Sequence, residues 1–179
     1  MRTTTTLNRL LVLVFALACA TNAHAVYTGL ELGYLIDSED EYIAARLGFE
    51  VFPAEAGSHN LEAEVGYFED SESFVKIEIL PITVNYRLEV HSAEKWSYNA
   101  GVGAGMSRVR VKASGYGFSS SDNAFTAQAF AGASYKFSPS LAFTLGVRYI
   151  WIDDIELGSL GGVEVGDDVA FSAGVRFQF

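Results

Sequence analysis

Residues 26–179 alternate apolar and polar side chains with a period of two, and this alternation constrains the fold more than any other feature of the chain. Neighbouring side chains of an extended strand point to opposite faces, so the pattern predicts strands with one apolar and one polar face. No segment carries apolar residues at the i, i+3 and i+4 spacing of an amphipathic helix. The longest apolar run, residues 10–20, is too short for a membrane-spanning helix, which needs roughly 20 residues. The chain is therefore expected to be all-β.

The alternation divides into eight segments of 7 to 13 residues, centred on the roughly 9–11 residues of a tilted strand that crosses a bilayer. Strands of soluble proteins are more often about 5–6 residues long. The fourth segment has Ile79 on its apolar face before Leu80–Pro81 and Ile82 on that face after it. This change of parity predicts a β-bulge, where a proline is tolerated. The eight segments are residues 26–36, 43–51, 61–67, 75–87, 96–107, 125–137, 141–151 and 169–179.

Two further features indicate that the apolar faces meet lipid, rather than the core of a soluble β-sandwich, which alternates in the same way. The polar faces are rich in glycine, which leaves room in a narrow lumen for arginine and glutamate side chains. The aromatic residues of the apolar faces fall near strand ends, as in the two interfacial girdles of a membrane barrel. One predicted girdle contains Phe49, Tyr86, Trp96, Tyr98, Tyr135, Phe137, Phe177 and Phe179, and the other contains Tyr34, Tyr67, Phe125, Tyr149, Trp151 and Phe171.

The N-terminal segment has the parts of an export signal. Two arginines flank a short polar stretch before the apolar run, and Ala23-His24-Ala25 forms an A-x-A cleavage site. We expect residues 1–25 to be removed as a signal peptide, which lowers the formal net charge from −10 to −12 because both arginines are lost. Cys19, the single cysteine, lies within this signal. A lipoprotein signal is the alternative, but Ala16 stands where such a signal has a large aliphatic residue.

The connections between the segments differ in length. Five are short, whereas residues 108–123 and 152–168 are predicted to be long loops. Transmembrane barrels have short periplasmic turns and longer external loops, so both ends of the barrel domain are expected in the periplasm. An even number of strands closes into a ring without a free sheet edge, as lipid requires. The sequence therefore predicts one domain, residues 26–179, folded as an eight-stranded antiparallel up-and-down transmembrane β-barrel.

The export signal, the eight alternating segments and the C-terminal sequence Gly174-Val175-Arg176-Phe177-Gln178-Phe179 together resemble the small outer-membrane barrels of Gram-negative bacteria. The resemblance is to the OmpA/OmpX-like group of eight-stranded barrels and to the broad, partly porin-like, outer-membrane β-barrel domain family. It implies location in the cell outer membrane and contact with outer-membrane lipid and lipopolysaccharide. It also implies that the barrel assembly machinery reads a C-terminal signal, whose residues here are Gly174, Val175, Phe177 and Phe179.

Charged residues on the polar faces form the first candidate site. Five basic and five acidic side chains balance, and buried charges are tolerated when they are paired. Eight strands leave an interior just wide enough for side chains, so a salt-bridged plug is the simplest interpretation and a gated path for ions or solutes is the alternative. The predicted lumen residues are Glu31, Arg46, Glu50, Glu62, Glu64, Lys76, Glu78, Arg87, Arg148 and Arg176.

Some eight-stranded barrels are enzymes, namely lipid A deacylases and palmitoyltransferases. A serine–histidine–acid deacylase needs a histidine base near the outer leaflet. His59 and His91 fall in predicted periplasmic turns, at the opposite end of the barrel. Tyr116 and the serines at 119–121 fall in a predicted external loop that has no histidine. No catalytic residue is therefore expected, and a lipid A-modifying enzyme is the least favoured alternative.

Acidic residues gather where the external loops are expected. A solvated rim is the simplest interpretation, and weak binding of Ca²⁺ or Mg²⁺ by carboxylate oxygens is the alternative. No other cofactor or metal is expected. Arg108, Arg110 and Lys112 interrupt this acidity on one face and are a candidate contact for lipid phosphates. The candidate metal ligands are Asp37, Glu39, Asp40, Asp153, Asp154, Asp167 and Asp168.

These observations together predict a non-enzymatic membrane barrel with a structural or surface-interaction role. The alternative is a small channel or transporter for ions or hydrophobic solutes. We expect a monomer. A nucleic acid partner is not expected, because binding to phosphate backbones needs a basic surface and this chain has a formal net charge of −10.

Overall fold

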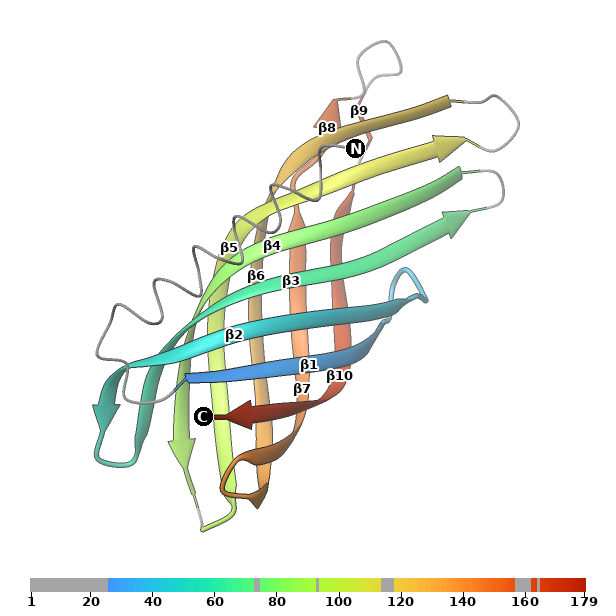
Figure 1. Cartoon of the computed structure of the whole chain (residues 1–179). Helices are drawn as coiled ribbons and strands as arrows, with labels where there is room; N and C mark the ends of the chain where they lie inside the picture. The colour runs from blue at the N-terminus through green and yellow to red at the C-terminus, as the bar shows by residue number, and fades with distance from the viewer. Residues whose placement is uncertain (1–25, 73–74, 93, 114–117, 157–161, 164) are drawn as a thin grey trace.

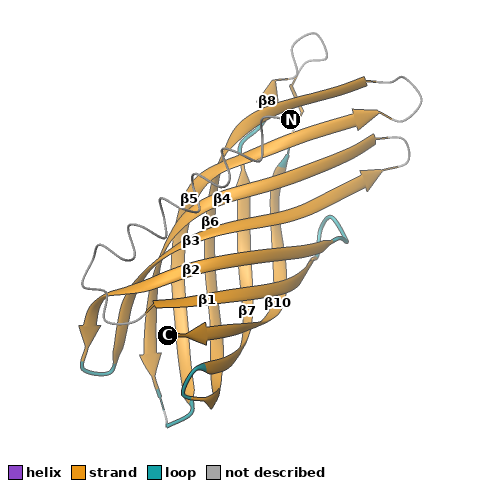
Figure 2. Cartoon of the chain, in the orientation of Figure 1, coloured by secondary structure: helices purple, strands orange, loops and turns teal. Residues whose placement is uncertain are grey.

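The computed structural model describes residues 26–72, 75–92, 94–113, 118–156, 162–163 and 165–179. The predicted signal peptide, residues 1–25, and Tyr116 lie outside the described residues. The described chain consists almost wholly of β-strands joined by short turns (Figure 2). No helix in these ranges is long and apolar enough to cross a membrane.

Eight strands form one closed barrel in which each strand pairs in antiparallel fashion with its neighbours and the last strand pairs with the first (Figure 1). The predicted all-β, eight-stranded antiparallel barrel is therefore confirmed. Two further short strands, β8 and β9, form a separate hairpin between β7 and β10. The strands are β1 (Val26–Leu35), β2 (Glu41–Ala54), β3 (Gly57–Glu72), β4 (Val75–His91), β5 (Trp96–Ala113), β6 (Phe118–Ser138), β7 (Leu141–Ile152), β8 (Ile155–Glu156), β9 (Gly162–Val163) and β10 (Gly166–Gln178).

The start of β1 and the end of β10 lie at the same end of the barrel, which we call the terminal end; the opposite end is the distal end (Figure 1). The backbone N–H of Phe179 donates to the carbonyl oxygen of Val26 over 2.9 Å. This bond continues the β1–β10 pairing to the last residue, so the ring is closed along the whole of β1.

Four consecutive strands are longer than the rest. β3, β4, β5 and β6 contain 16, 17, 18 and 21 residues, whereas the other four barrel strands contain 10 to 14. The extra residues continue past the distal rim as a sheet of these four strands (Figure 1). We call this part the distal sheet; it begins at the rim with Glu69 on β3, Glu78 on β4, Arg108 on β5 and Asn123 on β6.

The prediction of a long loop at residues 108–123 is wrong. β5 continues to Ala113 and β6 begins at Phe118, and these two residues are paired. The strand pattern was missed there because the outward residues change from apolar to charged. The predicted loop at residues 152–168 contains the β8–β9 hairpin.

The predicted β-bulge at Leu80–Pro81 is also wrong. Pairing between β4 and β5 runs without a shift from Val75 to His91. Ile79 is 4% exposed and points into the barrel, on the same face as the inward residues that follow it. The parity therefore stays constant, and what changes is the kind of residue that each face carries.

Glycine on the inner face makes room for the large inward side chains. The ring of Tyr27 lies directly over Gly48, where a Cβ atom would collide with it. A Cβ atom at Gly29 would approach the Cγ of Arg46 to 3.0 Å, which is tighter than most real contacts. The glycine-rich polar face thus accommodates an aromatic ring as well as the charged side chains.

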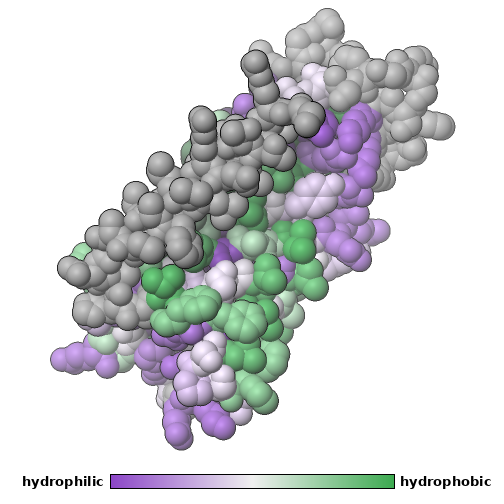
Figure 3. Space-filling view, viewed as in Figure 1, coloured by the Kyte–Doolittle hydropathy of each residue, from purple (hydrophilic) through white to green (hydrophobic). Residues whose placement is uncertain are grey.

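The hydrophobic core lies inside the distal end of the barrel, not at its middle. The outer wall below the distal rim is apolar, and side chains such as Leu32, Leu145 and Val102 are about 60% exposed (64%, 64% and 61%). Figure 3 shows hydrophobic side chains along part of this wall and hydrophilic ones towards both ends. The core contains Leu35, Tyr42, Ala44, Phe68, Ile79, Val109, Val111, Ala124, Ile150, Ile152, Ile155 and Ala170.

Candidate functional site

The centre of the lumen is organised around the carboxylate of Glu64. Arg148 donates to both of its oxygens, with Nη2 to Oε2 at 3.0 Å, and also reaches Glu31 at 3.3 Å. The hydroxyl of Tyr42 donates to Glu64 over 3.2 Å. Arg46 pairs with Glu31, and its Nε lies 3.7 Å from Glu64. Residues from β1, β2, β3 and β7 therefore meet in one cluster, which we call the central cluster.

Gln128 of β6 extends the central cluster to the other side of the barrel. Its side-chain amide donates to Asn85 over 2.6 Å and to Thr83 over 2.9 Å, and its carbonyl oxygen accepts from Arg148 over 2.6 Å. The guanidinium of Arg148 also faces the ring of Phe130, 5.4 Å from its centroid. Polar and cation–π contacts thus hold Arg148 from several strands at once.

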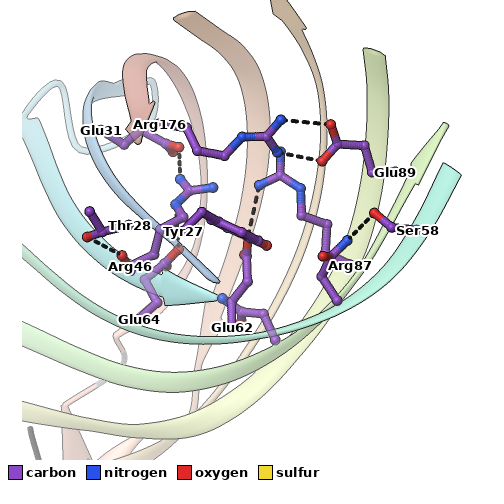
Figure 4. A network of polar contacts seen from close by, with 12 residues as sticks. Tyr27, Thr28, Glu31, Arg46, Ser58, Glu62, Glu64, Arg87, Glu89 and Arg176 are labelled. Atoms are coloured by element: carbon purple, nitrogen blue, oxygen red, sulfur yellow. Dashed lines mark hydrogen bonds and ion pairs between the residues drawn. The ribbon is translucent and has the colours of Figure 1, made fainter. Parts of the chain in front are cut away.

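A second group, the terminal cluster, contains Tyr27, Glu62, Arg87, Glu89 and Arg176 (Figure 4). It lies towards the terminal end, because Tyr27 is near the start of β1 and Arg176 is near the end of β10. The hydroxyl of Tyr27 donates to Glu62 over 2.6 Å, and Arg87 donates to the same carboxylate over 3.0 Å. Arg176 forms a two-point pair with Glu89, in which Nη2 lies 2.8 Å from Oε1. Fork-to-fork pairs of this kind are the strongest and most directional ion pairs in proteins.

The sequence pattern missed Glu89. The inward residues of β4 continue at every second position through Asn85, Arg87 and Glu89, but the fourth segment was ended at Arg87. β4 extends to His91, and the Glu89 side chain accepts a hydrogen bond from Ser97 of β5 over 2.6 Å. Continuing the period of two by one more pair of residues would have found it.

The two clusters contain equal numbers of opposite charges, all of them buried. The four carboxylates belong to Glu31, Glu62, Glu64 and Glu89, and the four guanidiniums to Arg46, Arg87, Arg148 and Arg176. None of these eight residues is more than 8% exposed. Because buried charges are costly unless paired, the balance is what allows so many in a narrow lumen.

Two predicted lumen residues lie elsewhere, and the prediction for them is wrong. Lys76 and Glu78 are on the outward face of the distal sheet, where Lys76 pairs with Glu69 at 2.7 Å and Glu78 pairs with Arg110 and Lys112. The prediction assumes a β-bulge at Leu80–Pro81. Because the structure has no bulge there, the alternation places Lys76 and Glu78 on the outward face. Glu50 is half-buried near the terminal end, and no ion pair involves it among the described residues.

Little space remains between the side chains of the lumen. A cavity of about 20 Å³ lies among Glu31, Arg46, Arg87 and Arg148. A volume of this size holds about one water molecule. On the distal side the hydroxyls of Ser107 and Thr126 bond at 2.5 Å, and the hydrophobic core follows beyond them.

Of the candidate metal ligands, Asp168 has a clear structural use. Its carboxylate accepts the backbone N–H groups of Ile36 (3.0 Å), Asp37 (3.1 Å) and Ser38 (3.0 Å), and the Ser38 hydroxyl at 2.6 Å. Burial opposes its ionisation, but these hydrogen bonds outweigh burial and lower the pKa of Asp168. The acidic side chain thus caps the turn that joins β1 to β2.

No group of three or more histidine, cysteine, aspartate or glutamate side chains within the described ranges is arranged to hold a metal ion. Asp153 and Asp154 bond to their own turn, where the Asp153 carboxylate accepts the backbone N–H of Asp154 at 3.0 Å. Asp37, Glu39 and Asp40 lie in the turn between β1 and β2, and Asp167 lies on β10.

The residues of the predicted assembly signal and the two histidines lie at the terminal end. Val175 and Phe177 lie on the outward face of β10 and Phe179 follows its last residue; Phe177 is 43% and Phe179 is 82% exposed, and Gly174 faces inward. His59 lies on the outward face of β3, with Nδ1 2.5 Å from the hydroxyl of Tyr86. His91 ends β4. Both histidines are therefore at the end opposite to the distal sheet.

The outward face of the distal sheet carries a ladder of charges. Arg108, Arg110 and Lys112 follow one another on β5, and Arg110 and Lys112 are 41% and 42% exposed at their side chains. Glu69 accepts a hydrogen bond from Lys76 and a second from Tyr67, and these bonds lower the pKa of Glu69. We call Arg108, Arg110 and Lys112 the basic strip.

Comparison with known proteins matches this architecture. Residues 10–179 match the family described as outer membrane protein beta-barrel domain. No curated protein sequence matches the chain.

Several solved structures resemble the chain at low sequence identity, so the likeness is one of fold, and three of them serve as examples. Neisserial surface protein A (NspA) has a TM-score of 0.68 at 15% identity, covering 87% of this chain and 96% of its own. Ail, the attachment invasion locus protein of Yersinia pestis, has a TM-score of 0.58 at 13% identity, covering 87% and 97%. The outer membrane enzyme PagL has a TM-score of 0.54 at 12% identity, covering 84% and 98%.

Proposed function

Because this chain belongs to the outer membrane protein beta-barrel domain family, we propose that it is a non-enzymatic barrel of the bacterial outer membrane with a structural or surface-interaction role. Its lumen is a plug of paired charges, not a path for solutes. The surfaces that interact with other molecules are then its outer wall and the parts that extend past the distal rim.

The proposal rests on two barriers that close the interior of the barrel, a layer of paired charges and a hydrophobic core. Four buried carboxylates pair with four buried guanidiniums, and the cavity among them has a volume of only about 20 Å³. A hydrophobic core follows on the distal side. An ion would have to break strong buried pairs and then cross an apolar layer, and both steps are costly.

Conductance in planar lipid bilayers tests the proposal. The refolded protein should insert without producing discrete current steps, and its insertion is checked separately by the altered gel mobility of folded barrels before and after boiling. Regular single-channel steps from the wild-type protein would overturn the plug and favour the alternative, a small channel or transporter for ions or hydrophobic solutes.

A lipid A-modifying enzyme is the other alternative, because the outer membrane enzyme PagL has a similar fold. Against it, the two described histidines, His59 and His91, lie at the terminal end. Mass spectra of lipid A from cells with and without the protein decide between the two. Identical spectra are expected, and a new or missing acyl chain would overturn the non-enzymatic proposal.

We further propose that residues 1–25 direct export, that the terminal end faces the periplasm, and that the barrel machinery reads Val175, Phe177 and Phe179 during assembly of a monomer. The outward exposure of Phe177 and Phe179 supports recognition of these residues by another protein. Phe179→Ala should lower the amount of folded barrel in the membrane. Phe137→Ala is the matched control, since Phe137 is also outward and 67% exposed but lies on β6. Equal assembly of the two variants would contradict the signal.

A further inference from the structure

We propose that the basic strip, Arg108, Arg110 and Lys112 on the outward face of β5, is a binding site for the phosphorylated sugar headgroup of lipopolysaccharide. The inference rests on the proposed orientation, in which the distal end faces the outside of the cell. It assigns a ligand to a surface that neither the lumen nor the fold requires.

The position of Arg108 is the first argument. Along seven barrel strands, or one residue past the end in the case of β7, the apolar outer wall ends at a polar residue on the distal side, and Arg108 is the one cation in this set. Its paired neighbours are Leu80 on β4 and Asn123 on β6, so no opposite charge faces it directly. The seven boundary residues are Glu41, Glu69, Glu78, Arg108, Asn123, Asp153 and Asp167.

The local charge is the second argument. Among outward residues of the distal sheet whose side chains are described, the cations are Lys76 and the three members of the basic strip, and the anions are Glu69 and Glu78. This face therefore has a formal charge of +2 by these six groups, in a chain whose net charge is −10. A positive patch on an acidic protein attracts a multiply charged anion locally while the rest of the surface repels it.

The ion pairs with Glu78 orient the basic strip but leave most of its hydrogen-bond donors available. Glu78 lies beside both Arg110, at 3.5 Å, and Lys112. One carboxylate cannot occupy five guanidinium N–H donors and three ammonium donors. Arg110 and Lys112 keep about two-fifths of their side-chain surface exposed, at 41% and 42%. Glu78 thus holds two cations in place with donors still directed outward.

The spacing of the three cations selects the class of lipid. Residues two apart on a strand are separated by about 7 Å along it. In a strand tilted by about 40° this is roughly 5 Å along the membrane normal, so the strip spans about 10 Å of depth. A glycerophospholipid carries its phosphate at one depth, so it can contact only Arg108, the cation of the strip that lies nearest the membrane. Lipopolysaccharide carries phosphates on the lipid A sugars at the membrane surface and further anionic groups on the sugars above them.

The wall below the strip completes the site. Met106 and Phe125 are paired neighbours on β5 and β6, two residues towards the membrane from Arg108 and Asn123, and they are 51% and 46% exposed. This apolar surface suits the acyl chains of a lipid whose headgroup lies against Arg108. The guanidinium fork of Arg108 then meets the first phosphate with two hydrogen bonds.

Binding of lipopolysaccharide to the refolded full barrel in neutral detergent micelles, followed by calorimetric titration, tests the site. The triple variant Arg108→Gln/Arg110→Gln/Lys112→Gln should lose roughly tenfold or more in affinity and show a shallower dependence on salt. Arg108→Gln should have the largest effect of the three single changes, and Arg108→Lys should recover part of the binding. Lys95→Gln, an exposed cation at the terminal end, is the matched control and should bind as the wild type does.

Two further ligands distinguish the source of the phosphate. Phosphatidylglycerol in the same micelles should lose much less affinity in the triple variant than lipopolysaccharide does, because its phosphate reaches only Arg108, and inorganic phosphate at millimolar concentration should not displace lipopolysaccharide. Equal binding of lipopolysaccharide by the wild type and the triple variant would overturn the site. An equal loss of phosphatidylglycerol binding, or displacement by free phosphate, would overturn the assignment to lipopolysaccharide. Gel mobility before and after boiling establishes that each variant is folded, and conductance of the same samples reports separately on the plug.

Discussion

The same four strands, β3 to β6, have opposite polarity in two parts of the molecule. Below the distal rim their outward side chains are apolar and their inward side chains are polar or charged. In the distal sheet the outward side chains are charged or polar, and inward ones such as Ile79, Val109 and Val111 join the hydrophobic core. The first arrangement suits lipid outside and a narrow polar lumen, and the second suits water outside.

β4 shows how little the backbone changes at the transition. Arg87 and Ile79 both point inward, and Tyr86 and Glu78 both point outward, with no shift of register against β5 between them. Strand geometry therefore persists through the membrane surface, while the surroundings select which residue type each face carries.

The largest expected effect is on the central cluster. Glu64→Gln leaves Arg148 and Arg46 buried beside a neutral amide, and should lower the free energy of unfolding by about 3–5 kcal/mol. Glu78→Gln removes a carboxylate that also neighbours two cations but on the outward face, and should cost about 0–1 kcal/mol. Urea titration of the barrel refolded in vesicles measures both. Equal losses would mean that the two regions do not differ in the cost of an unpaired charge.

A new arginine on the outward face should separate the two regions next. Val102→Arg places the charge on the lipid-facing part of β5 and should cost about 2–4 kcal/mol. Ser121→Arg places it on the distal sheet, opposite Arg110 on β5, and should cost about 0–1 kcal/mol. The same urea titration applies. A similar cost at both positions would move the membrane boundary past the distal sheet.

Loss of two methyl groups should distinguish the hydrophobic core from the lipid-facing wall. Val109 is fully buried, so Val109→Ala leaves a cavity and should cost about 2–3 kcal/mol. Val84 is 62% exposed on the outer wall of β4, where lipid fills the space, and Val84→Ala should cost about half as much. Thermal unfolding of the two variants in the same micelles compares them. A larger cost at Val84 would contradict the placement of the core.

The smallest effect concerns the capped turn between β1 and β2. Because the pKa of Asp168 is lowered in the folded protein, its ionised form stabilises the turn above the unfolded pKa, about 3.9, and this contribution is lost as the pH falls through the folded value. The side chain is partly exposed, so the effect is below about 1 kcal/mol. Hydrogen exchange of the amides of Ile36, Asp37 and Ser38, corrected for intrinsic rates, should show protection that is present at pH 5 and is lost progressively as the pH falls below about 4. In Asp168→Asn these amides should exchange faster at pH 5 and respond little to pH.

Most of the fold could be predicted from alternation alone, and most of the errors lie at the distal rim, with the missed Glu89 at the terminal end as the exception. The period of two correctly predicts that six charged residues face inward, and the structure brings them into two clusters. These residues are Arg46, Glu62, Glu64, Arg87, Arg148 and Arg176. The prediction misplaces Lys76 and Glu78 because it assumes that apolar residues face lipid along the whole of β4. Which carboxylate meets which guanidinium could not be predicted, since Arg176 and Glu89 are 87 residues apart and meet only across the closed barrel.

The sequence by itself determined that this chain forms strands, that there are eight long ones, and that one face of each is apolar, because side-chain direction in a strand depends only on the parity of the residue. It also placed arginine and glutamate on the inner wall. Only the tertiary structure decided where the apolar face stops facing lipid and begins to face the interior. That choice depends on how far each strand extends past the membrane, and hence on whether lipid or water surrounds the residue, which the period of two does not encode.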